Sequence, residues 1–177
     1  MRAMNGRRKF LAFSTLLAAM PWMQANAESA PADSRQTSLP LAADLAADGR
    51  IAGEQNIPVL VLFSLPGCPY CEAVRRSFLL PLLREAAPRA LVRQVDIDSS
   101  LVLTDFQGRN LSHQAFATRE GIALTPVVGF YGPAGEPVAA RLVGAMLPDF
   151  YGSYLDEALS KAAAQIRAIN AQKPSWR

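Results

Sequence analysis

Residues 57–71 read IPVLVLFSLPGCPYC, and this stretch decides how the chain is built. Its first nine residues form a continuous apolar run rich in β-branched side chains, whose length suits a strand buried on both faces. Pro-Gly ends the run, and Pro69 suits the first position of a helix because its fixed φ and missing N–H cost nothing there. Cys68 and Cys71, the two cysteines of the 177-residue chain, therefore lie where a buried strand turns into a helix.

The spacing of these cysteines predicts a reactive pair rather than a structural crosslink. A bond between Cys68 and Cys71 closes almost no loop, so it stabilises the fold very little. At a helix N-terminus, unpaired N–H groups and the helix dipole lower the pKa of a thiol. Cys68 is the expected attacking thiolate, and the more buried Cys71, one turn further along, is expected to resolve the mixed disulfide.

The remaining pattern alternates strands and helices. ALVRQVDID, residues 90–98, reads as a second strand and completes a β-α-β unit, and Pro81 predicts a kink or restart near Leu80 in the helix between the two strands. The other expected elements are a weak helix over 41–54, a small hairpin around Gly108, a short helix over 111–121, two antiparallel strands within 125–144, and a long helix from Tyr151 to Ile169.

The first 27 residues have the pattern of a signal peptide. MRAMNGRRK is basic, FLAFSTLLAAM is apolar but short for a membrane span, and Ala25-Asn26-Ala27 resembles a cleavage site. We expect export to the periplasm; an uncleaved anchor is the alternative, and RRKFL leaves both the twin-arginine and the ordinary export route open. Residues 28–40 are expected to be a linker, and residues 173–177 a frayed tail.

The charge balance excludes some partners. The chain has 18 basic and 15 acidic residues, but four of the basic residues and none of the acidic ones lie within residues 1–27. The rest of the chain is therefore close to neutral. This balance predicts binding neither to nucleic acid nor to an anionic membrane surface.

The order of elements, with C-x-x-C at the first strand-to-helix turn, resembles the thioredoxin fold over roughly residues 41–170. Three segments carry the resemblance: GCPYC, LTPVV at 124–128, where Pro126 matches the cis-proline that faces the active site, and GEPVAARLVG, which ends at Gly144. More narrowly, the chain resembles the periplasmic SoxW-type thioredoxins. The resemblance implies a single α/β domain over residues 41–172, with a mixed central sheet flanked by helices.

The resemblance also implies a function. It implies an exported thiol–disulfide oxidoreductase that reduces disulfides of periplasmic client proteins through Cys68 and Cys71. We expect no cofactor beyond this redox-active pair, and no metal. We also expect a monomer that receives electrons from a membrane donor. Pro69, Tyr70, Thr125 and Pro126 are expected to contact the client, with Thr125 pairing with its extended backbone. The short segment between Cys71 and the next strand leaves no room for the large helical insertion of periplasmic disulfide oxidases.

Departures from ordinary thioredoxins keep other interpretations open. Gly67 stands where thioredoxins have a tryptophan, and Leu62 stands where cytosolic thioredoxins have a buried aspartate. A disulfide oxidase or isomerase of the same fold is one alternative. A Cu(I) or thiol-binding carrier is another, because soft Cu(I) accepts two thiolates. Zinc fits poorly, since His113 is the only histidine of the chain and zinc usually takes four ligands; His113 is expected to be a solvated helix residue.

Overall fold

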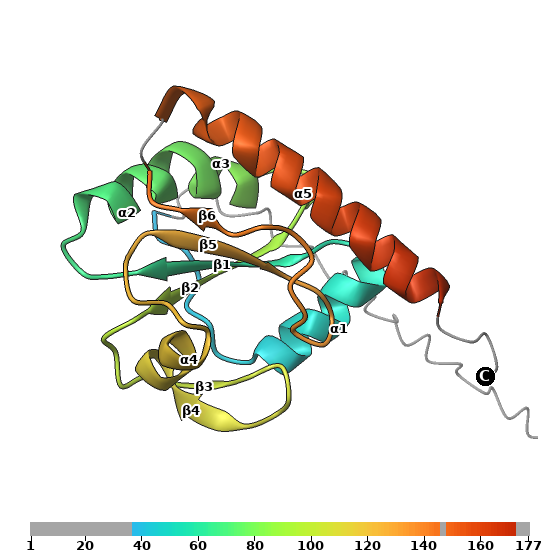
Figure 1. Ribbon diagram of the computed structural model, residues 1–177, viewed down its shortest axis with the longest axis horizontal. Coiled ribbons are helices and arrows are strands. Elements are labelled where there is room, and N and C mark those ends of the chain that lie inside the picture. The colour runs from blue at the N-terminus through green and yellow to red at the C-terminus, as the bar shows by residue number, and fades with distance from the viewer. Residues whose placement is uncertain (1–36, 146–147, 173–177) are drawn as a thin grey trace, which may run out of the picture. The chain divides into compact units, whose positions relative to one another are not determined.

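The computed structural model describes residues 37–145 and 148–172, shown as a coloured ribbon in Figure 1. The expected signal peptide, most of the expected linker and the expected tail lie outside the described residues. Within the described part, no helix combines the length and the apolar character that a membrane span requires.

A mixed four-stranded sheet forms the centre of the domain, with strand order β2-β1-β5-β6. Strand β1 (Val59–Ser64) pairs in parallel with β2 (Leu91–Asp96) and antiparallel with β5 (Val127–Tyr131). All six residues of β1 are buried, which confirms the strand buried on both faces that the apolar run predicts. Strand β6 (Leu142–Val143) is the other edge and is shorter than the sequence pattern suggests.

Helices cover both faces of this sheet (Figure 1). On one face lie α2 (Pro69–Val74), the π-helical turn η1 (Arg75–Leu79), α3 (Leu80–Leu83) and the long α5 (Pro148–Ala171). On the other face lie α1 (Leu45–Gln55), α4 (His113–Arg119) and the hairpin of β3 (Val102–Thr104) and β4 (Asn110–Ser112). The restart at Leu80 follows the prediction from Pro81, and the hairpin around Gly108 is confirmed.

Alternation along β1 divides the hydrophobic core into two halves. Leu60 and Leu62 pack with α3 and α5, whereas Val59, Val61 and Phe63 pack with α1 and α4. This division follows from the strand geometry, because successive side chains point to opposite faces of a sheet. The domain therefore has a layer of helices, a sheet and a second layer of helices, as the thioredoxin resemblance implies.

Two local expectations change in the structure. The first helix begins only at Leu45, where the Asp44 carboxylate accepts the Ala47 N–H at 2.8 Å. The preceding residues instead pair with the sheet, since Leu39 is buried and the Gln94 N–H donates to the Pro40 carbonyl at 2.8 Å. Leu39 and Pro40, the last residues of the expected linker, therefore already contact the domain.

His113 is not the solvated helix residue expected from the sequence. Its side chain is 1 % exposed, because α4 starts directly beneath the end of β2. The Asp96 backbone N–H donates to His113 Nδ1 at 3.2 Å, and His113 Nε2 lies 2.9 Å from the Ala42 carbonyl oxygen. With Nδ1 accepting, Nε2 donates to the Ala42 carbonyl, so the ring joins α4 to two other segments.

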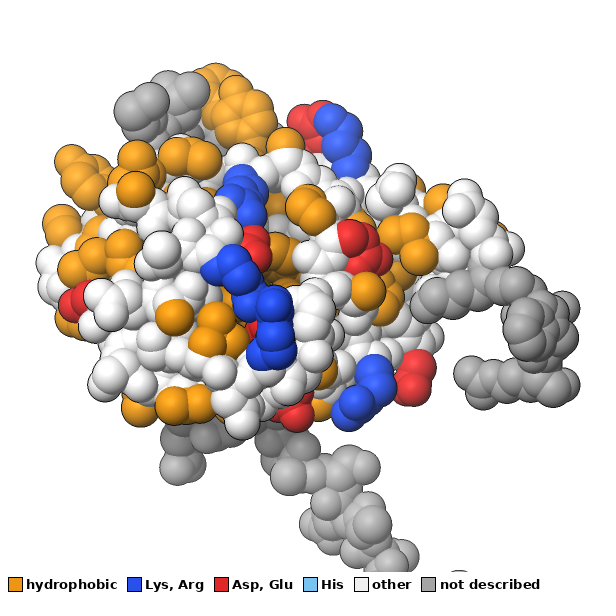
Figure 2. Space-filling view, turned by 60° about the horizontal axis from the view of Figure 1, so that its bottom comes forward, with side chains coloured by type: hydrophobic (Ala, Val, Ile, Leu, Met, Phe, Trp, Pro, Cys, Tyr) orange, Lys and Arg blue, Asp and Glu red, His pale blue; other side chains and the backbone are white. Residues whose placement is uncertain are grey.

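The charged side chains of the surface are mostly paired with opposite charges. Figure 2 shows basic and acidic side chains next to one another on the face that carries α4 and the β3–β4 hairpin. Arg109 and Arg119 both bind Asp105 there. Because Asp105 is buried, the two arginines are the exposed part of this group of ion pairs.

Candidate active site

Cys68 and Cys71 form a disulfide at the start of α2. Cys68 occupies the N-cap position, and its Sγ accepts the Cys71 backbone N–H at 3.1 Å. Gly67, just before it, has a φ of +74°, a conformation that glycine adopts without strain. Cys68 is partly exposed, whereas Cys71 is completely buried. One sulfur of the pair is therefore open to a reaction partner, and the other is enclosed by the protein.

A second segment reaches this disulfide from a distant part of the chain. The Thr125–Pro126 peptide bond is cis, and Thr125 Oγ1 donates to Cys68 Sγ over 3.8 Å. The Pro126 carbonyl accepts the Gly144 N–H at 2.8 Å, so the segment is tied to the end of β6. Pro126 is buried and Thr125 is half-buried beside the exposed sulfur.

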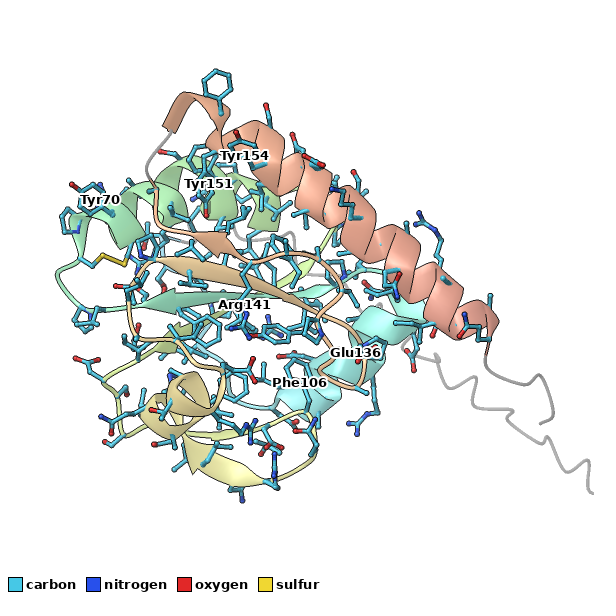
Figure 3. All side chains as sticks on the ribbon, in the orientation of Figure 1. Tyr70, Phe106, Glu136, Arg141, Tyr151 and Tyr154 are labelled. Atoms are coloured by element: carbon cyan, nitrogen blue, oxygen red, sulfur yellow. A yellow bond between two sulfur atoms is a disulfide. The ribbon has the colours of Figure 1, made fainter. Side chains whose placement is uncertain are left out.

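Pro69 and Tyr70 form the outer surface next to the disulfide. Tyr70 is 66 % exposed, and Figure 3 shows it on α2 beside the disulfide. Pro69 is also exposed. The structure thus brings together the cysteines and all four residues that the sequence analysis assigned to client contact.

A cavity of about 490 Å³ adjoins Cys68 on the side of β2. Its polar wall includes Ser64, Glu72, Arg75, Gln94 and Asp96. Sequence reasoning did not assign these residues to the site. Glu72 and Arg75 follow Cys68 by four and seven residues, a helical spacing that could have indicated one shared face. The contribution of β2 depends on strand pairing.

The Arg75 side chain organises this wall. Its Nε donates to Gln94 Oε1 at 3.0 Å, its Nη2 donates to Ser64 Oγ at 3.1 Å, and its Nη1 pairs with the Glu72 carboxylate. Gln94 Nε2 in turn donates to Asp96 Oδ1 at 2.7 Å. Only 16 % of the Arg75 side chain is exposed. The guanidinium is thus held at the side of the cavity that Cys68 also lines.

Glu72 is ionised at neutral pH in this arrangement. Partial burial acts to raise its pKa, but the hydrogen bond from Arg76 and the charges of Arg75 and Arg76 outweigh burial, so the pKa of Glu72 lies below its usual value. Glu72 therefore pairs with two arginines, one in the cavity wall and one that is 74 % exposed.

The interior behind the cysteines is apolar where a cytosolic thioredoxin has an acid. Leu62 is fully buried and packs in the core shared by the sheet, α3 and α5. Glu72 and Asp96 are the two carboxylates among the residues lining the cavity. In the described ranges, no three His, Cys, Asp or Glu side chains gather in a way that could hold a metal ion.

A family model identifies the class of domain to which the chain belongs. Residues 45–159 match the family model of the thioredoxin-like domain. The chain therefore belongs to the thioredoxin-like domain family, and its Cys68–Cys71 disulfide occupies the position of a redox-capable pair. Among solved structures, a thioredoxin-fold protein from Helicobacter pylori is 20% identical, with a TM-score of 0.41; the match covers 66% of this chain and 86% of that chain. A search of curated proteins gives no match.

Proposed function

We propose that the protein is an exported thiol–disulfide oxidoreductase that reduces disulfides of periplasmic client proteins. The observation that carries this proposal is the difference between the two sulfurs. Cys68 is partly exposed at a helix N-terminus, whereas Cys71 is fully buried one turn further along. A thiolate at Cys68 has both access to a client and the favourable end of the helix dipole.

The reaction proceeds by two thiol–disulfide exchanges, and in each of them one S–S bond forms while another breaks. The Cys68 thiolate attacks one sulfur of a client disulfide, forming a mixed disulfide and releasing the first client thiolate. The Cys71 thiolate then attacks Cys68 Sγ, re-forming the Cys68–Cys71 bond and releasing the second client thiolate. The two client thiolates take up protons from water or from the Cys71 thiol. The client gains two electrons, and the protein loses two.

The exposed surface around Cys68 supports a protein client. The half-buried Thr125 lies against the sulfur, and Pro69 and Tyr70 flank it from α2. An extended client segment can hydrogen-bond to the backbone at Thr125 while its disulfide meets Cys68. Each turnover leaves the protein oxidised, so an electron donor must reduce it again, and for an exported protein we propose that this donor is in the membrane.

Two further features support export and the direction of electron flow. The pattern of residues 1–27 is that of a periplasmic signal. Between Cys71 and β2, the chain forms only the short α2, η1 and α3, without an inserted helical domain. The first feature supports export to the periplasm, and the second favours a reductase over a disulfide oxidase.

The test is the catalysed reduction of a disulfide-bonded peptide, with dithiothreitol as the electron source. We expect the wild-type protein to accelerate the reaction and Cys68→Ser to reduce it to the rate with dithiothreitol alone, because the attacking sulfur is missing. Circular dichroism of the variant checks that it is folded. Wild-type activity in Cys68→Ser, or no acceleration by the wild-type protein, rejects the proposed function.

A further inference from the structure

The cavity beside Cys68 has three charged side chains in its wall. Glu72 and Asp96 are acidic, and Arg75 is the one cation among the described residues that line it. In the sequence, Arg75 stands seven residues after Cys68, well inside the helix. Tertiary packing instead puts the guanidinium and Cys68 in the wall of one cavity.

Arg75 is a fixed charge rather than a mobile surface cation. Gln94 and Ser64, which accept two of its hydrogen bonds, are 9 % and 0 % exposed. The third contact, to Glu72, comes from the same stretch of helix. These three partners hold the guanidinium in place beside the cavity that Cys68 also lines.

A fixed charge in a partly enclosed cavity acts strongly on a neighbouring thiolate. The effective dielectric constant there is lower than in bulk water, so electrostatic interactions are screened less. A cation favours the charged form of a thiol, and an anion disfavours it. Arg75 therefore acts in favour of the Cys68 thiolate, and Glu72 and Asp96 act against it.

We propose that the Glu72–Arg75 ion pair sets the stability of the Cys68 thiolate, with Arg75 favouring the thiolate and Glu72 restraining that effect. The inference rests on the proposed function, because it concerns the sulfur that attacks the client. Within the pair, neutralisation by Glu72 keeps the influence of Arg75 moderate. Asp96, which accepts a hydrogen bond from Gln94 and also lines the cavity, adds to the restraint.

The ion pair offers a test in which electrostatic and structural roles give different results. Replacing either partner breaks the same ion pair, so a purely structural role changes protein stability in the same direction for both variants. An electrostatic role instead moves the pKa of Cys68 in opposite directions. Arg76 is the matched control, since it also binds Glu72 but is not part of the cavity wall.

The measurement is the rate at which iodoacetamide alkylates the reduced full chain as a function of pH. Cys68 dominates this rate, because Cys71 is buried. We expect Arg75→Gln to raise the pKa of Cys68 by about 0.5 to 1, because a cation that lines the same cavity is then removed from a medium of intermediate dielectric constant. Glu72→Gln and Asp96→Asn are expected to lower it, Arg75→Lys to keep most of the wild-type value, and Arg76→Gln to change it by less than about 0.2.

The redox equilibrium provides a second readout. A less stable thiolate in Arg75→Gln makes the dithiol less favourable and the protein more reducing. A threefold to tenfold change in the equilibrium constant corresponds to about 15–30 mV toward more negative potential. Glu72→Gln is expected to move the potential in the opposite direction.

The outcomes separate this inference from the proposed function. Shifts of the Cys68 pKa in the same direction for Arg75→Gln and Glu72→Gln overturn the inference, as do two unchanged values or an equal shift in Arg76→Gln. In each case the peptide-disulfide reductase activity of the wild type can still stand. If Arg75→Gln does not fold, Glu72→Gln and Asp96→Asn decide alone, because both must lower the pKa of Cys68.

Discussion

Asp105 lies at the point where the β3–β4 hairpin meets the end of α4, and its removal should destabilise the protein in a pH-dependent manner. The carboxylate is fully buried and accepts four hydrogen bonds. Two come from the backbone N–H groups of Gln107 and Arg109, both at 2.8 Å. The other two come from the guanidinium groups of Arg109 at 2.9 Å and Arg119 at 2.6 Å.

The substitution Asp105→Asn keeps the shape of the side chain but removes its charge. One amide oxygen can still accept the two backbone N–H groups, while the amide nitrogen then faces the two guanidinium donors. Hydrogen bonds to charged groups contribute about 1.5–3 kcal/mol each to stability. Both arginines are partly exposed, so water replaces part of each lost interaction and the net cost is smaller than the sum. We therefore expect the free energy of unfolding to fall by about 2–3 kcal/mol at pH 7.

The pH dependence has a definite sign. Burial acts to raise the pKa of Asp105, but the Arg109 backbone N–H and the two guanidinium groups outweigh burial and hold the pKa well below its ordinary value. A depressed pKa in the folded state stabilises the protein above the unfolded value, near ~3.9, and this contribution is lost as the pH falls toward the folded value. The difference between wild type and variant should therefore stay constant from pH 7 to about 5 and shrink by about 1 kcal/mol at pH 3.

Urea unfolding of both proteins across this pH range measures the difference. Asp98→Asn is the matched control, since Asp98 is exposed, and it should change the free energy of unfolding by less than about 0.5 kcal/mol. A difference between wild type and Asp105→Asn that is the same at pH 3 and pH 7 would refute the electrostatic reasoning. So would a loss below about 1 kcal/mol at pH 7, because four hydrogen bonds to a buried carboxylate should contribute more.

Two further predictions concern the redox chemistry. Cys71→Ser should accumulate mixed disulfides with client proteins, detected on non-reducing gels and identified by mass spectrometry, because the resolving sulfur is absent; Cys68→Ser should accumulate few, and the reverse pattern would show that Cys71 attacks first. Equilibration with glutathione should give a potential nearer the −270 mV or so of thioredoxin than the −120 mV or so of the strong periplasmic oxidant, since Glu72 limits the influence of Arg75. A value above about −150 mV would instead make the protein an oxidase.

Local sequence determined most of the elements and the position of the redox pair. A nine-residue apolar run followed by Pro-Gly-Cys-Pro specifies a buried strand, a turn and a helix start through backbone preferences that act over a few residues. The strand, helix and hairpin patterns elsewhere are equally local. The resemblance to thioredoxins added Thr125 and Pro126, which no local pattern connects with Cys68.

Only the tertiary structure decided which polar side chains surround the disulfide. Arg75 and Gln94 meet because helix α2 and η1 pack over the sheet in a register that pairs Leu62 with Gln94. His113 is buried for a similar reason, since the start of α4 lies against the end of β2. These contacts depend on the packing of segments far apart in the sequence, and side-chain type alone does not predict whether an arginine or a histidine will be solvated or enclosed.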